Sequence, residues 1–172
     1  PEHGHVGDVG VRLDLTLDEL LPIGLKLGAD VPVFVAGRNA LGEGIGERLT
    51  PLDLPPAWYL VLTPQVSVST KEIFACALTG RSKELKIPPF FPGQGANDLE
   101  AAVVARYPEV AAHLEWLRLR NPQARMTGSG ACVFAQFESE AEARALHRQL
   151  PGDMSGFVAR GLDRHPLLDS KY

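Results

Sequence analysis

The sequence predicts an α+β protein in which the chain after residue 57 forms a split βαβ, ferredoxin-like antiparallel sheet with helices on one face. Two observations lead to this fold class. From residue 57 on, strand-type apolar runs and amphipathic helical stretches follow the order strand, helices, strand, strand, helix, strand. The composition, 45% hydrophobic and 22% charged residues, is that of a packed protein.

The charge and hydropathy patterns exclude several function classes. A net charge of −4 lacks the basic excess that binding to a phosphate backbone needs, and the strands lack the paired aromatic side chains of RNA-binding sheets, so we expect no nucleic-acid partner. No apolar run approaches the roughly 20 residues of a membrane span, and the start of the chain has no signal pattern. We therefore expect no membrane partner and a cytoplasmic location, and we leave the oligomeric state open.

The cysteines and histidines do not form a metal-binding pattern. Cys76 and Cys132 are far apart and have no CxxC or CxxH companion, which argues against a zinc site or a disulfide framework. The one close histidine pair, His3 and His5, falls in a glycine-rich start. We therefore predict no metal ligands.

The N-terminal part begins with an unassigned segment followed by a helix. Residues 1–12 carry three glycines and no periodicity, so we expect poor order there. A helix is predicted from Thr16 to about Leu27, because Thr16 can cap it, Glu19 stands at the third position, and Gly28 can end it.

Asp30 is the first candidate functional residue. It lies between the end of this helix and an apolar run over residues 31–36 that we predict to be a strand, followed by a tight reversal over residues 37–39. An acid at such a junction is held by both elements and can face a substrate, which makes Asp30 a candidate general base. The alternative is an Asp that only caps or turns the chain locally.

A second strand is predicted over residues 40–49, with glycines at alternate positions 42, 44 and 46. This alternation allows another backbone or a ligand to approach closely, or it marks a bulged or sharply bent strand. The proline-rich residues 51–56 that follow are predicted to be a domain seam.

The elements after this seam are capped by recognisable residues. Ser69 and Ser139 can cap helices, and Pro108 suits the first position of another. The predicted elements are a strand over 58–63, a helix from 69 to 78, a loop over 80–94, helices over 97–106 and from 108 to 117, strands over 123–127 and 131–137, a helix over 139–150, and a strand over 156–161.

Two further features have candidate chemistry. The hairpin between the strands at 123–127 and 131–137 has unobstructed backbone amides and two hydroxyl groups, a combination that can bind an anionic oxygen; the alternative is a plain β-turn. Phe74 can stack on a flat ring, or it can belong to the core. The hairpin residues are Thr127, Gly128, Ser129, Gly130 and Ala131.

Five ordered segments resemble a known family. The chain is similar to the diphosphocytidyl-methylerythritol kinases, in the superfamily of galactokinase, homoserine kinase, mevalonate kinase and phosphomevalonate kinase. The resemblance covers about residues 13–168. The matching segments are Leu27-Gly28-Ala29-Asp30-Val31-Pro32-Val33-Phe34, Glu43-Gly44-Ile45-Gly46-Glu47, Trp58-Tyr59-Leu60-Val61, Asn97-Asp98-Leu99-Glu100 and Met126-Thr127-Gly128-Ser129-Gly130-Ala131-Cys132-Val133-Phe134.

The resemblance implies a function and assigns roles. It implies ATP-dependent phosphorylation of 4-diphosphocytidyl-2-C-methyl-D-erythritol, a small-molecule substrate of the non-mevalonate route to isoprenoid precursors. ATP and Mg²⁺ are the implied cofactors, although no carboxylate cluster identifies the Mg²⁺ ligands. Asp30 matches the catalytic aspartate, the glycine hairpin matches a motif on the substrate and phosphate side, and Phe74 falls where an aromatic ring meets the cytosine. We expect Thr70, at the start of the same helix, to be a substrate-binding residue.

The resemblance also implies a division of the chain, and one departure. Residues 13–56 correspond to a remnant of the N-terminal kinase domain and residues 57–172 to the C-terminal kinase domain. The family's early lysine, its Tyr-His pair and its Gly-Gly-Gly-Ser-Ser phosphate loop have no counterpart here. We therefore expect this chain alone to be a truncated, nearly inactive portion. The alternative is a non-catalytic α+β binding or regulatory module, or a truncated remnant without chemistry.

Overall fold

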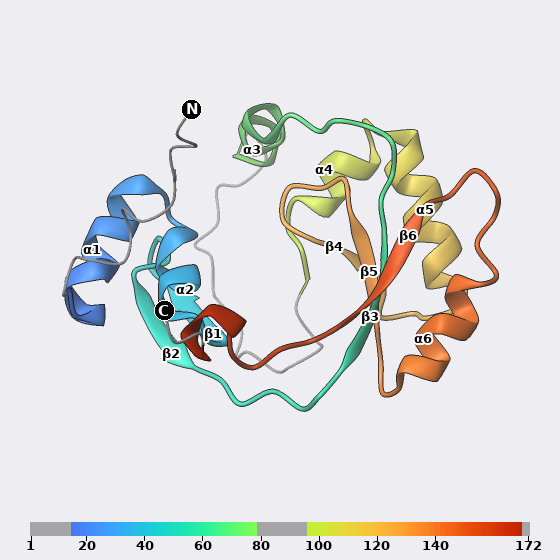
Figure 1. Ribbon diagram of the computed structural model, residues 1–172. Helices are drawn as coiled ribbons and strands as arrows, with labels where there is room; N and C mark the ends of the chain where they lie inside the picture. Colours follow the sequence, from blue (N-terminus) through green and yellow to red (C-terminus); the bar gives the residue numbers. More distant parts are fainter. Residues whose placement is uncertain (1–14, 79–95, 170–172) are drawn as a thin grey trace, which may run out of the picture. The chain divides into compact units, whose positions relative to one another are not determined.

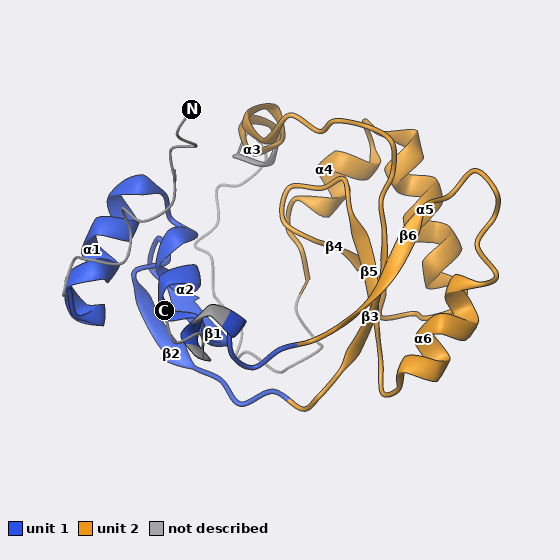
Figure 2. Ribbon diagram, in the orientation of Figure 1, with its two compact units in different colours: residues 1–54, 162–172 blue, residues 55–161 orange. Residues whose placement is uncertain are grey.

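The structure, a computed structural model, describes residues 15–78 and 96–169. The predictions for residues 1–12 and 80–94 lie outside these ranges. The chain divides into two compact units, residues 1–54 with 162–172 (unit 1) and residues 55–161 (unit 2), and the division falls within the proline-rich connector (Figure 2). We describe each unit by itself.

Unit 2 is built on a four-stranded antiparallel sheet in the order β4-β5-β3-β6 (Figure 1). Its first strand, β3, lies in the middle and pairs with both β5 and β6, as a split βαβ arrangement requires. The predicted ferredoxin-like topology is confirmed. The elements are β3 (Trp58–Leu62), α3 (Thr70–Leu78), α4 (Glu100–Val104), α5 (Pro108–Arg118), β4 (Arg125–Met126), β5 (Val133–Phe137), α6 (Glu140–His147) and β6 (Gly156–Arg160).

The core of unit 2 lies between the helices and one face of this sheet. Alternate residues of β3 and β5 point to the helices, so Leu60, Leu62, Val133 and Ala135 are fully buried. The helices contribute apolar side chains to the same cluster. These are Ile73 from α3, Val103 from α4, Val110, Leu114 and Leu117 from α5, and Leu146 from α6.

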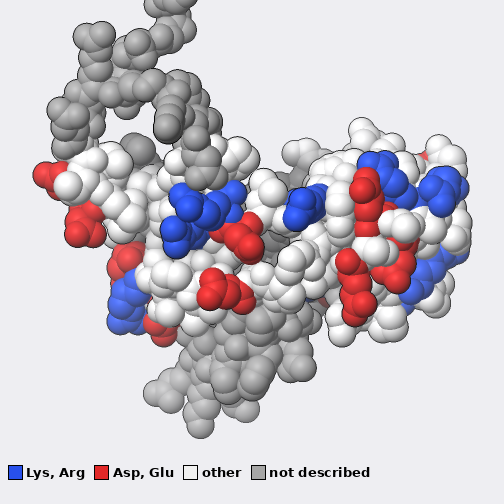
Figure 3. All heavy atoms as spheres, turned by 60° about the horizontal axis from the view of Figure 1, so that its bottom comes forward, with Lys and Arg blue, Asp and Glu red and all other residues white. Residues whose placement is uncertain are grey.

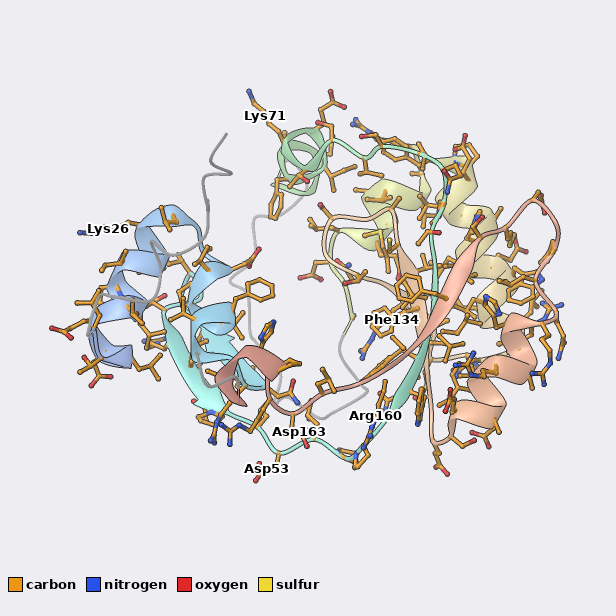
Figure 4. All side chains as sticks on the ribbon, viewed as in Figure 1. Lys26, Asp53, Lys71, Phe134, Arg160 and Asp163 are labelled. Carbon is orange, nitrogen blue, oxygen red and sulfur yellow. The ribbon has the colours of Figure 1, made fainter. Side chains whose placement is uncertain are left out.

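The opposite face of the sheet carries aromatic side chains. The centres of the Tyr59 and Phe134 rings lie 5.9 Å apart in an edge-to-face arrangement, and the Arg125 guanidinium lies 5.3 Å from the centre of the Phe134 ring. Figure 4 labels Phe134. The expectation that the strands lack paired aromatics was therefore wrong. The two residues are diagonal neighbours, because Phe134 pairs with Val61 and Tyr59 pairs with Gln136, and the register that brings them together is not visible in the sequence.

Unit 1 begins with α1 (Leu17–Leu27), which starts and stops as predicted. The Glu19 carboxylate accepts hydrogen bonds from the backbone N–H and the hydroxyl of Thr16, both at 2.8 Å. Gly28 ends the helix, and its N–H donates to the Gly24 carbonyl. The other elements of unit 1 are α2 (Val31–Ala36), β1 (Ala40–Glu43), β2 (Arg48–Pro51) and a short 3₁₀ turn (Pro166–Asp169).

Residues 31–36, predicted to be a strand, form the helix α2 instead. The valines at 31 and 35 fit both a strand and an i, i+4 helical pair, so periodicity alone does not separate the two. Packing of both valines against Gly24 of α1 favours the helix. A Cβ placed on Gly24 would lie 3.1 Å from Val31 Cγ1 and 3.4 Å from Val35 Cγ2, which shows how closely the two valines cover this glycine of α1.

Residues 40–49, predicted to be one strand, form a hairpin instead. β1 pairs with β2 from Ala40 opposite Pro51 to Glu43 opposite Arg48, and the chain reverses between them. Gly44 and Gly46 have φ angles of +72° and +112°, which side chains other than glycine rarely adopt. Two of the three alternating glycines therefore form the turn between β1 and β2, and they do not lie on one face of a continuous strand.

Residues after β6 return to unit 1. Arg38 and Arg164 form an isolated bridge, and the Asn39 N–H donates to the Asp163 carbonyl at 3.4 Å. The side-chain amide of Asn39 also donates to an Asp163 carboxylate oxygen at 3.2 Å; Figure 4 labels Asp163. The sequence did not predict this pairing, because it joins residues more than a hundred positions apart.

Unit 1 exposes large apolar side chains. Leu27 and Phe34 are 77% and 73% exposed. By contrast, the buried hydrophobic residues described above belong to unit 2. An exposed apolar set of this size is typical of a surface that packs against further polypeptide.

Charged side chains of both signs occur on the face of unit 2 that Figure 3 shows, with acidic and basic groups interspersed. This mixed surface agrees with the absence of a basic excess in the sequence. None of the described helices has both the length and the apolar character needed to span a bilayer.

Acid should weaken the two local structures that Glu19 and Glu47 hold. The hydrogen bonds from Thr16, first from its backbone N–H, lower the pKa of Glu19 below 4.5. The pKa of Glu47 is lowered by its own backbone N–H and then by that of Ile45. Because both values are lowered on folding, the stabilisation is present above pH 4.5 and is lost as the pH falls through the lowered pKa. Carboxyl titrations followed by NMR should give midpoints below 4.5 for both groups, and midpoints at or above 4.5 would contradict the hydrogen bonds.

Candidate active site

The predicted site residues are distributed over both units. Asp30 belongs to unit 1, whereas Thr70, Phe74 and the loop over residues 127–131 belong to unit 2. We call residues 127–131 the glycine loop. The structure brings Thr70 and the glycine loop together within unit 2.

Asp30 lies in the short link between α1 and α2. Its backbone has helical angles of φ −85° and ψ −12°, and the Val31 N–H donates to the Gly28 carbonyl at 3.1 Å, which closes the link. The Asp30 side chain is exposed and does not cap α2 through a hydrogen bond. Among the described residues nothing bonds or pairs with its carboxylate, so both oxygens are available to accept a proton.

The β1–β2 turn packs against the backbone beside Asp30. A Cβ placed on Gly46 would collide with the carbonyl oxygen of Ala29, the residue before Asp30. The prediction that these glycines allow another backbone to approach closely thus holds at Gly46. The turn therefore fixes the link that carries Asp30.

Replacing Gly46 should displace this link. Gly46→Ala introduces both the collision with Ala29 and a side chain at φ +112°, and we expect it to destabilise the fold by about 1–3 kcal/mol in urea unfolding. Gly42→Ala is the matched control in the same hairpin, because its nearest contacts are at an ordinary 3.8 Å. Equal losses of stability in the two variants would contradict the close approach.

The glycine loop joins β4 to β5 through a tight turn. The Gly130 N–H donates to the Thr127 carbonyl at 3.0 Å, and the Thr127 N–H donates to the Cys132 carbonyl at the same distance. The first bond is that of a β-turn, which was the alternative left open for this segment. Gly128 and Gly130 have φ angles of +55° and +92°, so both positions favour glycine.

Three backbone amides of this loop have no partner within the described part of the chain. Among the described residues, no acceptor bonds to the N–H groups of Gly128, Ser129 or Ala131. A Cβ on Gly128 would meet no atom within 4 Å, so the loop is open on that side. Successive uncommitted amides at glycine positions suit an anionic oxygen, and anion binding by this loop stays a prediction.

Helix α3 contributes one group to this loop and exposes a second on the same helix face. The Thr70 hydroxyl and the Ser129 hydroxyl lie 2.8 Å apart in a hydrogen bond. Phe74 follows Thr70 by four positions, hence on the same helix face, and is 49% exposed. The core alternative for Phe74 was therefore wrong, and the ring is available to stack on a ligand.

The structure adds a group of polar contacts made by Asn97 and Glu100, whose segment the sequence marked as a helix start and as part of the family resemblance. The Asn97 side-chain amide donates to the carbonyls of Met126 at 3.0 Å and Gly128 at 2.7 Å. One Glu100 oxygen accepts from the Met126 N–H at 3.0 Å, and the other pairs with Arg118 at 2.7 Å. In the sequence, the only indication of these contacts is an asparagine three positions before a glutamate. Without the register of the sheet, this spacing does not show which backbone groups the two side chains bind.

In residues 15–78 and 96–169 there is no group of three or more His, Cys, Asp or Glu side chains that could hold a metal ion. Mg²⁺ ligands are therefore not identified by the part of the chain that the structure describes, and no step is assigned to the ion.

The bond between Thr70 and Ser129 should be measurable by a double-mutant cycle. Both groups are uncharged and partly solvated, so we expect a coupling of about 0.5 kcal/mol between Thr70→Val and Ser129→Ala in urea unfolding. Strictly additive effects would show that α3 and the glycine loop are not joined by this bond.

The comparisons with known proteins define first a class and then a family. The model for the C-terminal domain of GHMP kinases matches residues 92–155, which contain the glycine loop. The chain is 58% identical to a 4-diphosphocytidyl-2-C-methyl-D-erythritol kinase of Nitrosospira multiformis, a match that covers 92% of this chain and 55% of that protein. It is 57% identical to the kinase of the same name from Thiobacillus denitrificans, over 92% of this chain and 57% of the relative.

A solved structure agrees with these relatives. A crystal structure of 4-(cytidine 5'-diphospho)-2C-methyl-D-erythritol kinase matches with a TM-score of 0.67 and 27% identity, over 86% of this chain and 57% of that one. The matching domain model, the named relatives and the fold thus define the class of GHMP kinases. Within it, the chain belongs to the 4-diphosphocytidyl-2-C-methyl-D-erythritol kinase family, and it spans a little over half the length of the relatives it matches.

Proposed function

We propose that this chain supplies the catalytic aspartate and the substrate-side domain of an ATP-dependent kinase that phosphorylates 4-diphosphocytidyl-2-C-methyl-D-erythritol. The observation that carries the proposal is the identity of 58% and 57% to kinases of that name along nearly the whole chain. The polar contacts between Thr70, Ser129 and the open glycine loop support it, because they give that shared sequence a site suited to phosphate oxygens.

Asp30 is the proposed general base. Transfer of a phosphoryl group to an alcohol requires that the hydroxyl lose its proton, and a carboxylate without competing hydrogen bonds can accept it. The Asp30 carboxylate is exposed and has no bonding partner among residues 15–78 and 96–169, which fits this role, and the fixed link between α1 and α2 gives it a defined position.

The glycine loop and α3 are proposed to bind the substrate. The uncommitted amides of the loop suit the diphosphate of the substrate, and the exposed Phe74 ring suits its cytosine face. ATP is the proposed phosphoryl donor and Mg²⁺ the proposed ion, which would neutralise phosphate charge when bound. A cytoplasmic location belongs to the same proposal.

The test is a coupled ADP-release assay on two forms of the protein. One form is this chain, and the other is this chain joined to the part of the Nitrosospira multiformis relative that it does not span. In the active form we expect Asp30→Asn to lower kcat by about 10²–10⁴-fold, since this is the usual contribution of a general base. Asp53→Asn is the matched control, because Asp53 is also an exposed carboxylate of unit 1.

The outcomes distinguish a kinase from a non-catalytic module. Activity lost with Asp30→Asn and kept with Asp53→Asn supports the proposal. Two folded forms without ADP release, or an Asp30→Asn variant as active as its parent, would overturn it.

A further inference from the structure

We propose that Asn97 is the positioning residue of the glycine loop, and that it keeps the loop's free amides directed toward the bound phosphate groups. The inference rests on the proposed function for its ligand, but its geometry stands on contacts within unit 2. Asn97 would not touch the reacting atoms; it acts through the backbone of residues 126–129.

The orientation of the Asn97 side chain is fixed by three hydrogen bonds. Its oxygen accepts from the Leu99 N–H at 3.0 Å, and its nitrogen donates to the carbonyls of Met126 and Gly128 at 3.0 and 2.7 Å. A flipped amide would place its oxygen against two carbonyl oxygens and its NH₂ group against an N–H donor. Only one orientation satisfies all three partners.

This contact determines where the loop amides point. In a planar trans peptide the carbonyl and the following N–H are directed to opposite sides. Holding the Gly128 carbonyl on Asn97 therefore directs the Ser129 N–H away from Asn97, and this N–H is one of those without a partner. If the peptide turned over, its carbonyl oxygen would replace the N–H at the anion site and repel a phosphate.

The neighbouring contacts make Asn97 part of a fixed frame. Met126 is buried, and its two backbone groups are held from one short segment, the carbonyl by Asn97 and the N–H by Glu100. Arg118 pairs with Glu100 and also donates from Nε to the Ala124 carbonyl at 3.0 Å. The loop therefore begins from an immobilised strand end, and Asn97 extends this frame by two residues to Gly128.

The chain contains a matched control for Asn97. Asn121 accepts from the N–H two residues ahead, that of Gln123, at 3.1 Å, and its amide donates to a β5 carbonyl, that of Gln136, at 2.9 Å. It therefore makes the same kind of contacts away from the glycine loop. Serine retains an acceptor oxygen and removes the amide donor without adding charge, so Asn97→Ser and Asn121→Ser make the same chemical change at two places.

The experiment uses the full chain labelled with ¹⁵N. Amide hydrogen exchange is measured at Thr127 and Gly130, and binding of inorganic pyrophosphate is followed through the amide signals of Gly128, Ser129 and Ala131. For Asn97→Ser we expect about tenfold faster exchange at Thr127 and Gly130 and about tenfold weaker pyrophosphate binding. For Asn121→Ser we expect both quantities to stay within about twofold of the parent.

Each outcome decides the proposal. Equal effects of the two variants, or no effect of Asn97→Ser on exchange and binding, would overturn the positioning role. If pyrophosphate does not shift the loop amide signals of the parent chain, the phosphate-binding part of the proposed function fails. The positioning role of Asn97 is then tested only by comparing hydrogen exchange in Asn97→Ser and Asn121→Ser. Should Asn97→Ser not fold, Asn97→Asp is measured by exchange only, because its charge would itself repel pyrophosphate; the same acceleration is expected.

Discussion

The structure of unit 2 depends on the pairing of β3 with strands on both sides. β3 forms antiparallel ladders with β5 and with β6, and it buries Leu60 and Leu62 completely against the helices. Each such leucine contributes about 1.5–3 kcal/mol through burial, so a register shift that turned them to solvent would be costly. The same register fixes where β5 begins, and therefore where the glycine loop lies relative to α3 and α4.

The loop itself is ordered by polar contacts rather than by the core. Its turn hydrogen bond, the Thr70 and Ser129 hydroxyls and the Asn97 amide all act on a segment whose glycines have no side chains to bury. Such contacts contribute about 1 kcal/mol each, which makes them weak stabilisers of the fold. Their importance lies in direction: they determine which backbone groups face a ligand and which face the protein.

The sequence predicted the parts of this fold that depend on local chemistry. Helix starts at Thr16, Pro108 and Ser139 were predicted because a cap or a proline acts within one turn, and the sheet topology followed from the order of the elements. Residues 31–36 were misassigned, because a valine pattern that fits both periods is decided by a contact with Gly24.

The candidate site shows the same limit. Thr70 and the glycine loop could be singled out by residue type, and the structure joins them. The role of Asn97 could not be predicted, since its partners are main-chain carbonyls about thirty positions away. Every residue has such a carbonyl, so the residue type does not show which one accepts a hydrogen bond. Side-chain chemistry is readable in a sequence, whereas side-chain recognition of the backbone needs the fold.

The return of residues 162–169 to unit 1 affects the order in which the chain can fold during synthesis. Unit 2 is continuous, and its ends are joined by the bond from the Gly161 N–H to the Ala57 carbonyl at 2.8 Å. In unit 1, Gly37 and Asn39 form backbone hydrogen bonds with His165 and Asp163. The ribosome synthesises these two partners only after all of unit 2. The later-starting unit can therefore close first, and Gly37 and Asn39, which follow the helix after Asp30, gain these bonds only when translation has passed His165.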